Sequence, residues 1–156
     1  LLDLVLPGRF QKISYQNREF ILDVAHNPAA TEYLAKRLKA EPAKGKTCAI
    51  VAMMSDKDRV ASLANLVAVV DDWFVLDLST IPRAASAQVL SADLVSLKAG
   101  VQLSGNINQL VTEMTQCLWQ PVAVYMSFLQ ESTSRILDNG GLLMQIMVQI
   151  TAQRLV

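Results

Sequence analysis

The chain has 156 residues, of which 52% are hydrophobic and 18% charged. This composition fits one domain with a substantial core, residues 1–156, and excludes extended disorder. Fourteen basic residues balance fourteen acidic ones, so net charge gives no reason to expect nucleic acid or an anionic membrane as a partner.

No apolar run approaches the length of a membrane span. The two cysteines form no disulfide framework or C-x-x-C metal pair, which favours a reducing cytoplasm. The chain begins with Leu1 instead of Met, so we expect a fragment of a longer protein.

The first elements in chain order are a hairpin and a helix. Residues 10–15 alternate apolar and polar side chains, residues 16–18 suit a turn, and residues 19–23 include an apolar strand. Asn27 is a good helix cap and Pro28 suits the first helical position. Apolar residues at helical spacing then predict a helix over about 28–39.

The rest of the chain alternates strands with helices. Strands are predicted at 46–53, 73–78, 102–104 and 121–128, and helices at 58–70, 86–97 and 106–119, with a final helix within 131–156. Gly100 is expected to end the helix over 86–97. This alternation predicts an α/β, Rossmann-like three-layer domain with a mostly parallel sheet. The opening hairpin should add an antiparallel edge strand.

Polar clusters fall where ligands bind in open α/β sheets, at the carboxyl ends of strands. Asp23 to Pro28 lies between a strand and a helix N-terminus, which suits a phosphate. Asp23 could accept hydrogen bonds from ribose hydroxyls, and His26 is the single histidine. The alternative is structural: Asp23 and Asn27 would cap the helix, and His26 would be an ordinary loop residue.

Two further clusters contain cations. Lys57, within Met54 to Asp58, could pair with a substrate carboxylate, or the segment could be a solvated loop with a helix cap. Arg9 could reach a phosphate, or it could be an exposed residue after a turn. The sequence has no GxxxxGK[ST] loop, no HExxH motif and no Ser/His/Asp order, which argues against a P-loop, a zinc site or a hydrolase in this chain.

Taken together, three motifs resemble one family. Pro7-Gly8-Arg9-Phe10, Asp23-x-Ala25-His26-Asn27-Pro28 and Ser55-Asp56-Lys57-Asp58 are similar to the C-terminal, glutamate-ligase domain of folylpolyglutamate/dihydrofolate synthases, in the Mur ligase superfamily. The resemblance covers about residues 4–128. It implies an enzyme that uses ATP and Mg²⁺ to join L-glutamate to dihydropteroate or folate through an acyl phosphate. It also implies that a separate P-loop ATPase domain, absent from this sequence, holds most of the ATP and Mg²⁺, so the fragment alone should be inactive.

The resemblance assigns roles by position. Arg9 would contact ATP phosphates, Asp23 the ribose, His26 the reacting centre with Asn27 beside it, Lys57 the glutamate carboxylate, and Ser127 the glutamate pocket; no metal ligand is assigned. One departure stands out: Met126 and Leu129 replace the Gly before and the His after the family's Ser-Phe pair. Residues 130–156 resemble nothing in the family, which indicates either a changed reading frame or true divergence.

Two alternative functions remain. A peptidoglycan Mur ligase uses the same scaffold, although the Ala-His-Asn-Pro form favours the folate branch. A non-enzymatic Rossmann-like binding module would have no P-loop anywhere in its gene. The sequence leaves open whether the product is dihydrofolate, polyglutamylated folate or both.

Overall fold

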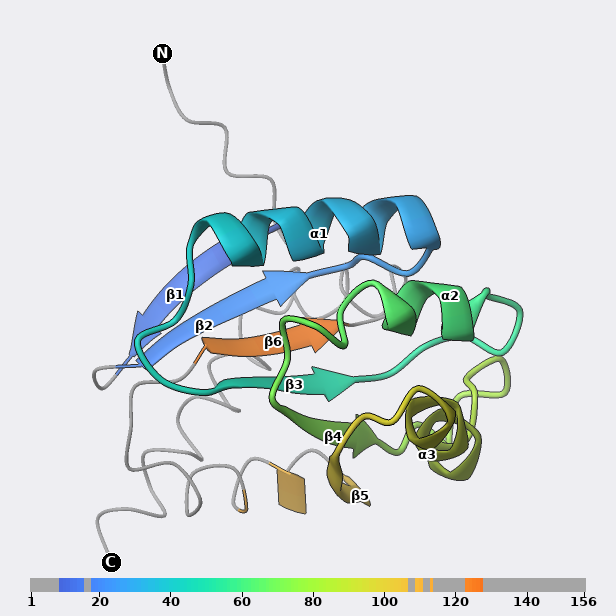
Figure 1. Cartoon of the computed structure of the whole chain (residues 1–156). Coiled ribbons are helices and arrows are strands. Elements are labelled where there is room, and N and C mark those ends of the chain that lie inside the picture. The colour runs from blue at the N-terminus through green and yellow to red at the C-terminus, as the bar shows by residue number, and fades with distance from the viewer. Residues whose placement is uncertain (1–8, 16–17, 107–108, 111–112, 114–122, 128–156) are drawn as a thin grey trace, which may run out of the picture.

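The computed structural model describes residues 9–15, 18–106, 109–110, 113 and 123–127 (Figure 1). Its six strands form one sheet in the order β1-β2-β6-β3-β4-β5. The strands are β1 Gln11–Tyr15, β2 Arg18–Asp23, β3 Thr47–Val51, β4 Asp72–Leu76, β5 Val101–Gly105 and β6 Ala123–Ser127. The helices are α1 Pro28–Ala40, α2 Arg59–Ala64 and α3 Ala87–Ser96.

Strand direction confirms the predicted α/β class. β1 and β2 pair antiparallel as a hairpin, whereas β2–β6, β6–β3, β3–β4 and β4–β5 are all parallel. The sheet is therefore mostly parallel, and the hairpin supplies the antiparallel edge strand. The unexpected feature is the place of β6, the last strand in sequence, between β2 and β3.

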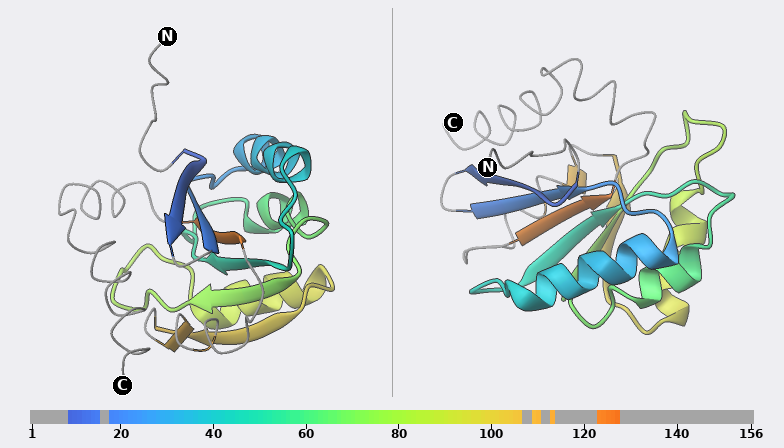
Figure 2. Two further views of the ribbon diagram at one scale, coloured as in Figure 1. Left: turned by 90° about the vertical axis from the view of Figure 1, so that its left-hand side faces the viewer. Right: turned by 90° about the horizontal axis from the view of Figure 1, so that it is seen from above.

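The described helices α1, α2 and α3 lie on one side of the sheet (Figure 2), with α1 packed against α2 and α2 against α3. The chain steps in one direction from β2 through β3 and β4 to β5, and then returns to β6. Most of the helix predicted over 106–119 lies outside the described residues. Asn106 and Gln109 cap each other at the start of this return, each backbone N–H donating to the other side chain at 3.0 Å. Leu110, which follows this cap, is buried.

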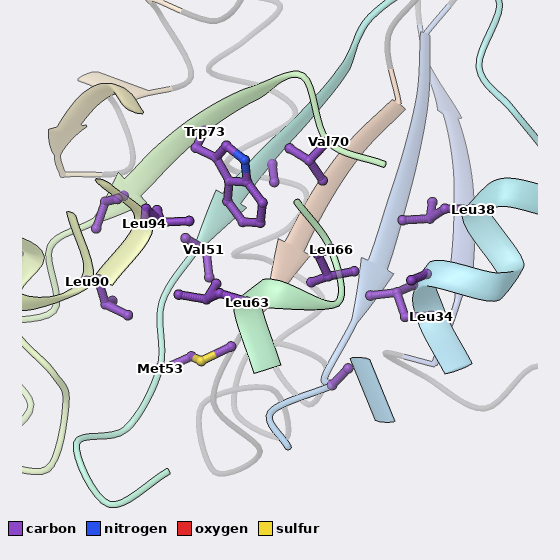
Figure 3. Close-up of a cluster of buried hydrophobic side chains, with 14 of the residues drawn as sticks. Leu34, Leu38, Val51, Met53, Leu63, Leu66, Val70, Trp73, Leu90 and Leu94 are labelled. Atoms are coloured by element: carbon purple, nitrogen blue, oxygen red, sulfur yellow. The ribbon is translucent and has the colours of Figure 1, made fainter. Parts of the chain in front are cut away.

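The core lies between the sheet and these helices (Figure 3). β3 and β4 are buried at their last four positions, which is why both read as continuous apolar runs rather than alternating patterns. Each helix contributes apolar residues one turn apart, and the central side chains are Leu34, Leu38, Leu63, Leu66, Trp73, Leu90 and Leu94. β5 alternates between half-buried and exposed positions, as suits a strand at the edge of a sheet.

Two helix ends differ from the sequence predictions. α2 stops at Ala64 and is followed by turns. In these turns Leu66 donates to the carbonyl of Leu63 and Val69 to that of Leu66, both at 2.9 Å, while the four-residue bonds from Val67 and Val70 to the same carbonyls are longer, 3.2 and 3.1 Å. α3 ends at Ser96, and Lys98, not Gly100, adopts the left-handed conformation with φ 59°. In the part of the chain that the structure describes, no helix is long and apolar enough to span a membrane.

Candidate active site

Three strands end side by side at one edge of the sheet. Asp23, Ser127 and Val51 are the last residues of β2, β6 and β3, and Ser127 is the register partner of both Asp23 and Val51. The loops that carry His26 and Lys57 leave from the ends of β2 and β3. The fold therefore brings Asp23, Ser127 and the loops of His26 and Lys57 to the same edge, where ligands bind in sheets of this class.

Asp23 is tied to two backbone amides. Its Oδ1 accepts the N–H of Ala25 at 2.8 Å, and its Oδ2 accepts the N–H of Phe10 at 2.7 Å. Burial raises the pKa of the Asp23 carboxyl above its ordinary value; these two N–H groups and the charges of Arg9 and Arg37 act in the opposite direction. A carboxylate offers about four lone-pair positions, so a group with two backbone donors still has capacity for ribose hydroxyls.

Arg9 is exposed and lies next to a bend at Phe10. Phe10 has a φ of 45°, in the left-handed region that non-glycine residues rarely occupy. Its ring lies under the guanidinium of Arg37 on α1, 4.0 Å from the ring centroid. Phe10 is thus held against both the end of β2 and α1, and Arg9 is close enough to lower the pKa of Asp23.

His26 is half-buried, and its orientation is fixed by its own loop. Nδ1 lies 2.8 Å from the carbonyl oxygen of Val24. Because a carbonyl only accepts hydrogen bonds, Nδ1 must carry the proton in this arrangement. In the neutral imidazole Nε2 is then the nitrogen that can accept a hydrogen bond.

Asn27 caps α1, as the structural alternative predicted. Its Oδ1 accepts the N–H of Ala30 at 2.9 Å, and Pro28 follows in the first turn. The same alternative is wrong for Asp23, which holds Phe10 and Ala25 instead of capping the helix. At the end of α2, the Nδ2 of Asn65 donates to the carbonyl of Pro28 at 2.8 Å. This hydrogen bond fixes the start of α1 against the end of α2.

Lys57 lies in the loop after β3, which is hydrogen-bonded to the loop after β4. Its Nζ is 3.6 Å from Oδ2 of Asp56, and Nη2 of Arg83 is 3.5 Å from the same oxygen. The backbone N–H and Oγ of Ser55 donate to the carbonyl of Arg83 at 2.8 and 3.0 Å. Slight burial raises the pKa of Asp56, but its own backbone N–H, Lys57 and Arg83 outweigh this and hold the pKa below its ordinary value. Asp58 caps α2, so the structural alternative is confirmed for that residue.

Arg83 is the charged residue at this edge that the sequence analysis missed. No motif singled out in the sequence contains it, but the pairing of the loops after β3 and β4 brings it to Asp56. Its position after the carboxyl end of β4 is the signal that could have identified it.

No metal centre is formed by the described part of the chain, where no three His, Cys, Asp or Glu side chains are grouped to hold an ion. For Ser127 the structure gives the backbone position, the last residue of β6. Residues 1–8 and 128–156, which include Leu129 and the predicted tail, lie outside the described residues.

Residues 8–126 match the family described as "Mur ligase, glutamate ligase domain". The chain belongs to this family. The match includes Arg9, Asp23, His26, Asn27 and Lys57, and it stops at Met126, one residue before Ser127.

Curated relatives of this glutamate ligase domain are all larger proteins. The chain is 50% identical over 86 residues to the dihydrofolate synthase/folylpolyglutamate synthase of Escherichia coli (strain K12), covering 55% of this chain and 20% of that protein. The protein of the same name from Buchnera aphidicola subsp. Baizongia pistaciae is 35% identical over 88 residues, covering 56% of this chain and 20% of its own length. The chain therefore spans about a fifth of these relatives.

Solved structures agree with this placement. "E.coli FolC in complex with DHPP and ADP" superposes with a TM-score of 0.74 at 33% identity, covering 87% of this chain and 31% of that one. The bifunctional folylpolyglutamate synthase/dihydrofolate synthase from Yersinia pestis, complexed with AMPPNP and a Mn ion, has a TM-score of 0.70 at 35% identity, covering 85% and 31%. The glutamate ligase domain of these proteins shares the fold described above.

Proposed function

We propose that this chain is the C-terminal domain of an ATP-dependent ligase that adds L-glutamate to dihydropteroate or folate. It would close the ATP site and hold the glutamate. One observation carries the proposal: Asp23 and Ser127 are register partners at the edge from which the His26 and Lys57 loops emerge, in a glutamate ligase domain whose named relatives are dihydrofolate synthase/folylpolyglutamate synthases.

The chemistry needs cations and backbone donors at one point. ATP phosphorylates the substrate carboxylate to an acyl phosphate, the glutamate amine attacks the acyl carbon, an amide forms and phosphate leaves. Negative charge gathers on the transferred phosphate, so the reaction depends on positioned charges and on closure around the substrates. The edge offers a helix N-terminus at Asn27, an exposed guanidinium at Arg9 and the imidazole Nε2 of His26.

The proposed roles follow from these positions. Arg9 contacts the ATP phosphates, Asp23 the ribose, and His26 the phosphates near the reacting centre with Asn27 beside it. Lys57 and Ser127 hold the glutamate, with Lys57 exchanging its weak ion pair with Asp56 for a substrate carboxylate. An exposed pair of this kind contributes little to stability, so the exchange costs little.

Mg²⁺ enters the proposal only through the rest of the enzyme. The described residues form no cluster that fits a metal, so we assign Mg²⁺ and most of the ATP contacts to a P-loop ATPase domain outside this chain. We expect this chain to have no ligase activity without that domain. A reducing cytoplasm is the compartment we propose, because the two cysteines, Cys48 and Cys117, lie far apart in the sequence and form no disulfide framework.

The encoding gene provides the first test. A GxxGK[ST]-type loop upstream of Leu1 supports the ligase; an open reading frame without one would favour a non-enzymatic binding module. The complete enzyme should then glutamylate dihydropteroate or folate and leave uridine-nucleotide-linked peptidoglycan precursors unchanged. The reverse preference would identify a peptidoglycan Mur ligase. Resequencing codons 120–156 would show whether a frame correction restores Gly-Ser-Phe-His.

A further inference from the structure

Asp23 closes the β1–β2 hairpin with its side chain. The ladder pairs Gln11 with Leu22, and the next pair in this register would be Phe10 and Asp23. There the N–H of Phe10 donates to the Asp23 side chain, through Oδ2 at 2.7 Å. The Asp23 carboxylate thus accepts the Phe10 N–H at the position where the backbone pairing of β1 and β2 ends.

The same carboxylate holds the His26 loop. Its second oxygen, Oδ1, accepts the N–H of Ala25 at 2.8 Å, one residue before His26. One side chain therefore links two segments that carry proposed active-site residues, Arg9 and His26. An amide could not replace it fully, because Asn has one acceptor oxygen and presents an N–H₂ donor on the other side.

The bend at Phe10 requires such support. A φ of 45° is costly for a residue with a side chain and persists only where surrounding contacts impose it. The ring of Phe10 packs against the edge of the core, with the Arg37 guanidinium 4.0 Å and the Lys12 Nζ 5.7 Å from its centroid. The backbone N–H of Phe10 is held by the Asp23 carboxylate. The direction of the chain at this bend sets where Arg9 points.

We propose that Asp23 is a positioning residue for Arg9: it holds the bend at Phe10 and so aims Arg9 at the nucleotide phosphates, in addition to its own contact with the ribose. The inference rests on the proposed function of Arg9 and Asp23. It adds that the two residues act together, so loss of the carboxylate misplaces the guanidinium even when no ribose hydroxyl is present.

Amide hydrogen exchange in this chain tests the contact itself. In Asp23→Ala the Phe10 amide should exchange about tenfold faster or more, because a hydrogen bond to a charged acceptor is lost. Asp23→Asn keeps the side-chain volume and should accelerate exchange at Phe10 or Ala25. Asp71→Asn is the matched control, since Asp71 accepts the N–H of Thr47 at 2.7 Å and should affect that amide but not Phe10. A Phe10 amide that exchanges at the wild-type rate in both Asp23 variants overturns the proposal.

A double-mutant cycle in the complete ligase tests the coupling. The Michaelis constant is measured for 2′,3′-dideoxy-ATP, which has no ribose hydroxyl at either position, in wild type, Arg9→Ala, Asp23→Asn and the double variant. We expect Asp23→Asn to raise this constant severalfold, and to raise it no further once Arg9 is alanine. No penalty with the dideoxy nucleotide, or equal penalties with and without Arg9, overturns the coupling. Wild-type kinetics in Arg9→Ala also overturn it, and this outcome would place the failure in the proposed role of Arg9. The hydrogen-exchange result does not depend on these kinetic outcomes, because it tests only the contact between Asp23 and Phe10.

Discussion

Asp23 and Ser127 are register partners at the ends of the neighbouring parallel strands β2 and β6, although 104 positions separate them in the sequence. Val51, the last residue of β3, pairs with Ser127 on its other side. This arrangement depends on the insertion of β6 between β2 and β3. The insertion places Asp23, Ser127 and Val51 next to one another at the ends of three adjacent strands. The spacing of these residues in the sequence does not reveal this arrangement.

His26 is expected to be required for turnover and unimportant for folding. Its hydrogen bond to Val24 lies within its own loop, so His26→Ala should leave the unfolding midpoint nearly unchanged. In the complete ligase we expect turnover to fall about a hundredfold or more, the scale for a group that stabilises developing charge. Steady-state kinetics and thermal unfolding of the same preparations check this. A correctly folded variant with near wild-type turnover would remove His26 from the site.

Lys57→Ala should weaken glutamate binding specifically. Lys57 follows the carboxyl end of β3, whereas the exposed Lys44 precedes its amino end; Lys44→Ala is therefore a matched control at the opposite edge of the sheet. We expect the Michaelis constant for glutamate to rise about tenfold or more in Lys57→Ala, from loss of a charge-assisted contact, and to stay constant in Lys44→Ala. An unchanged constant in both variants would leave Lys57 as an ordinary loop residue.

The ion pair between Arg59 and Asp93 should stabilise the packing of α2 against α3. Nε of Arg59 is 2.8 Å from Oδ2 of Asp93, and the two side chains are only 21% and 16% exposed. Removing one partner of a largely buried pair leaves the other charge uncompensated, so Arg59→Ala should lower the free energy of unfolding by about 1.5–3 kcal/mol. Lys36→Ala breaks an exposed pair with Glu32 and should lower the free energy of unfolding much less than Arg59→Ala. Equal losses in urea denaturation would contradict this ranking.

Asp23 should make stability depend on pH in the acid range. Burial raises its pKa above the ordinary value of 3.8, so the folded chain binds the proton at higher pH than the unfolded chain. The resulting stabilisation is present below the unfolded pKa and is lost as pH rises through the folded one. Relative to Asp23→Asn, wild type should therefore lose stability as pH rises above 3.8. Urea denaturation of both proteins across this interval measures the difference; a difference that grows in favour of wild type would contradict the shift.

Much of the fold could be predicted from the sequence because its signals are local. The cap at Asn27 and the apolar spacing after it gave α1 to within a residue, 28–39 against Pro28–Ala40. Continuous apolar runs identified β3 and β4, since strands covered on both faces need no polar alternation. The end of α2 was misplaced because side-chain spacing stays helical while the backbone tightens into turns after Ala64.

The contacts that build the site are long-range, and sequence patterns do not specify them. The first motif meets Asp23 only because the hairpin brings Phe10 back to the end of β2. Arg83 reaches Asp56 only through the pairing of two loops. Residue types at strand ends could therefore be identified as candidates, but their partners depended on strand order and loop packing.

The most direct measurement is ATP- and glutamate-dependent ligation by the P-loop ATPase domain alone, by this chain alone, and by the two joined in one protein. The proposed function predicts amide product and phosphate release only from the joined protein, with dihydropteroate or folate as acceptor. Full activity of the ATPase domain without this chain, or no activity of the correctly folded joined protein, would contradict the claim that this edge completes the active site.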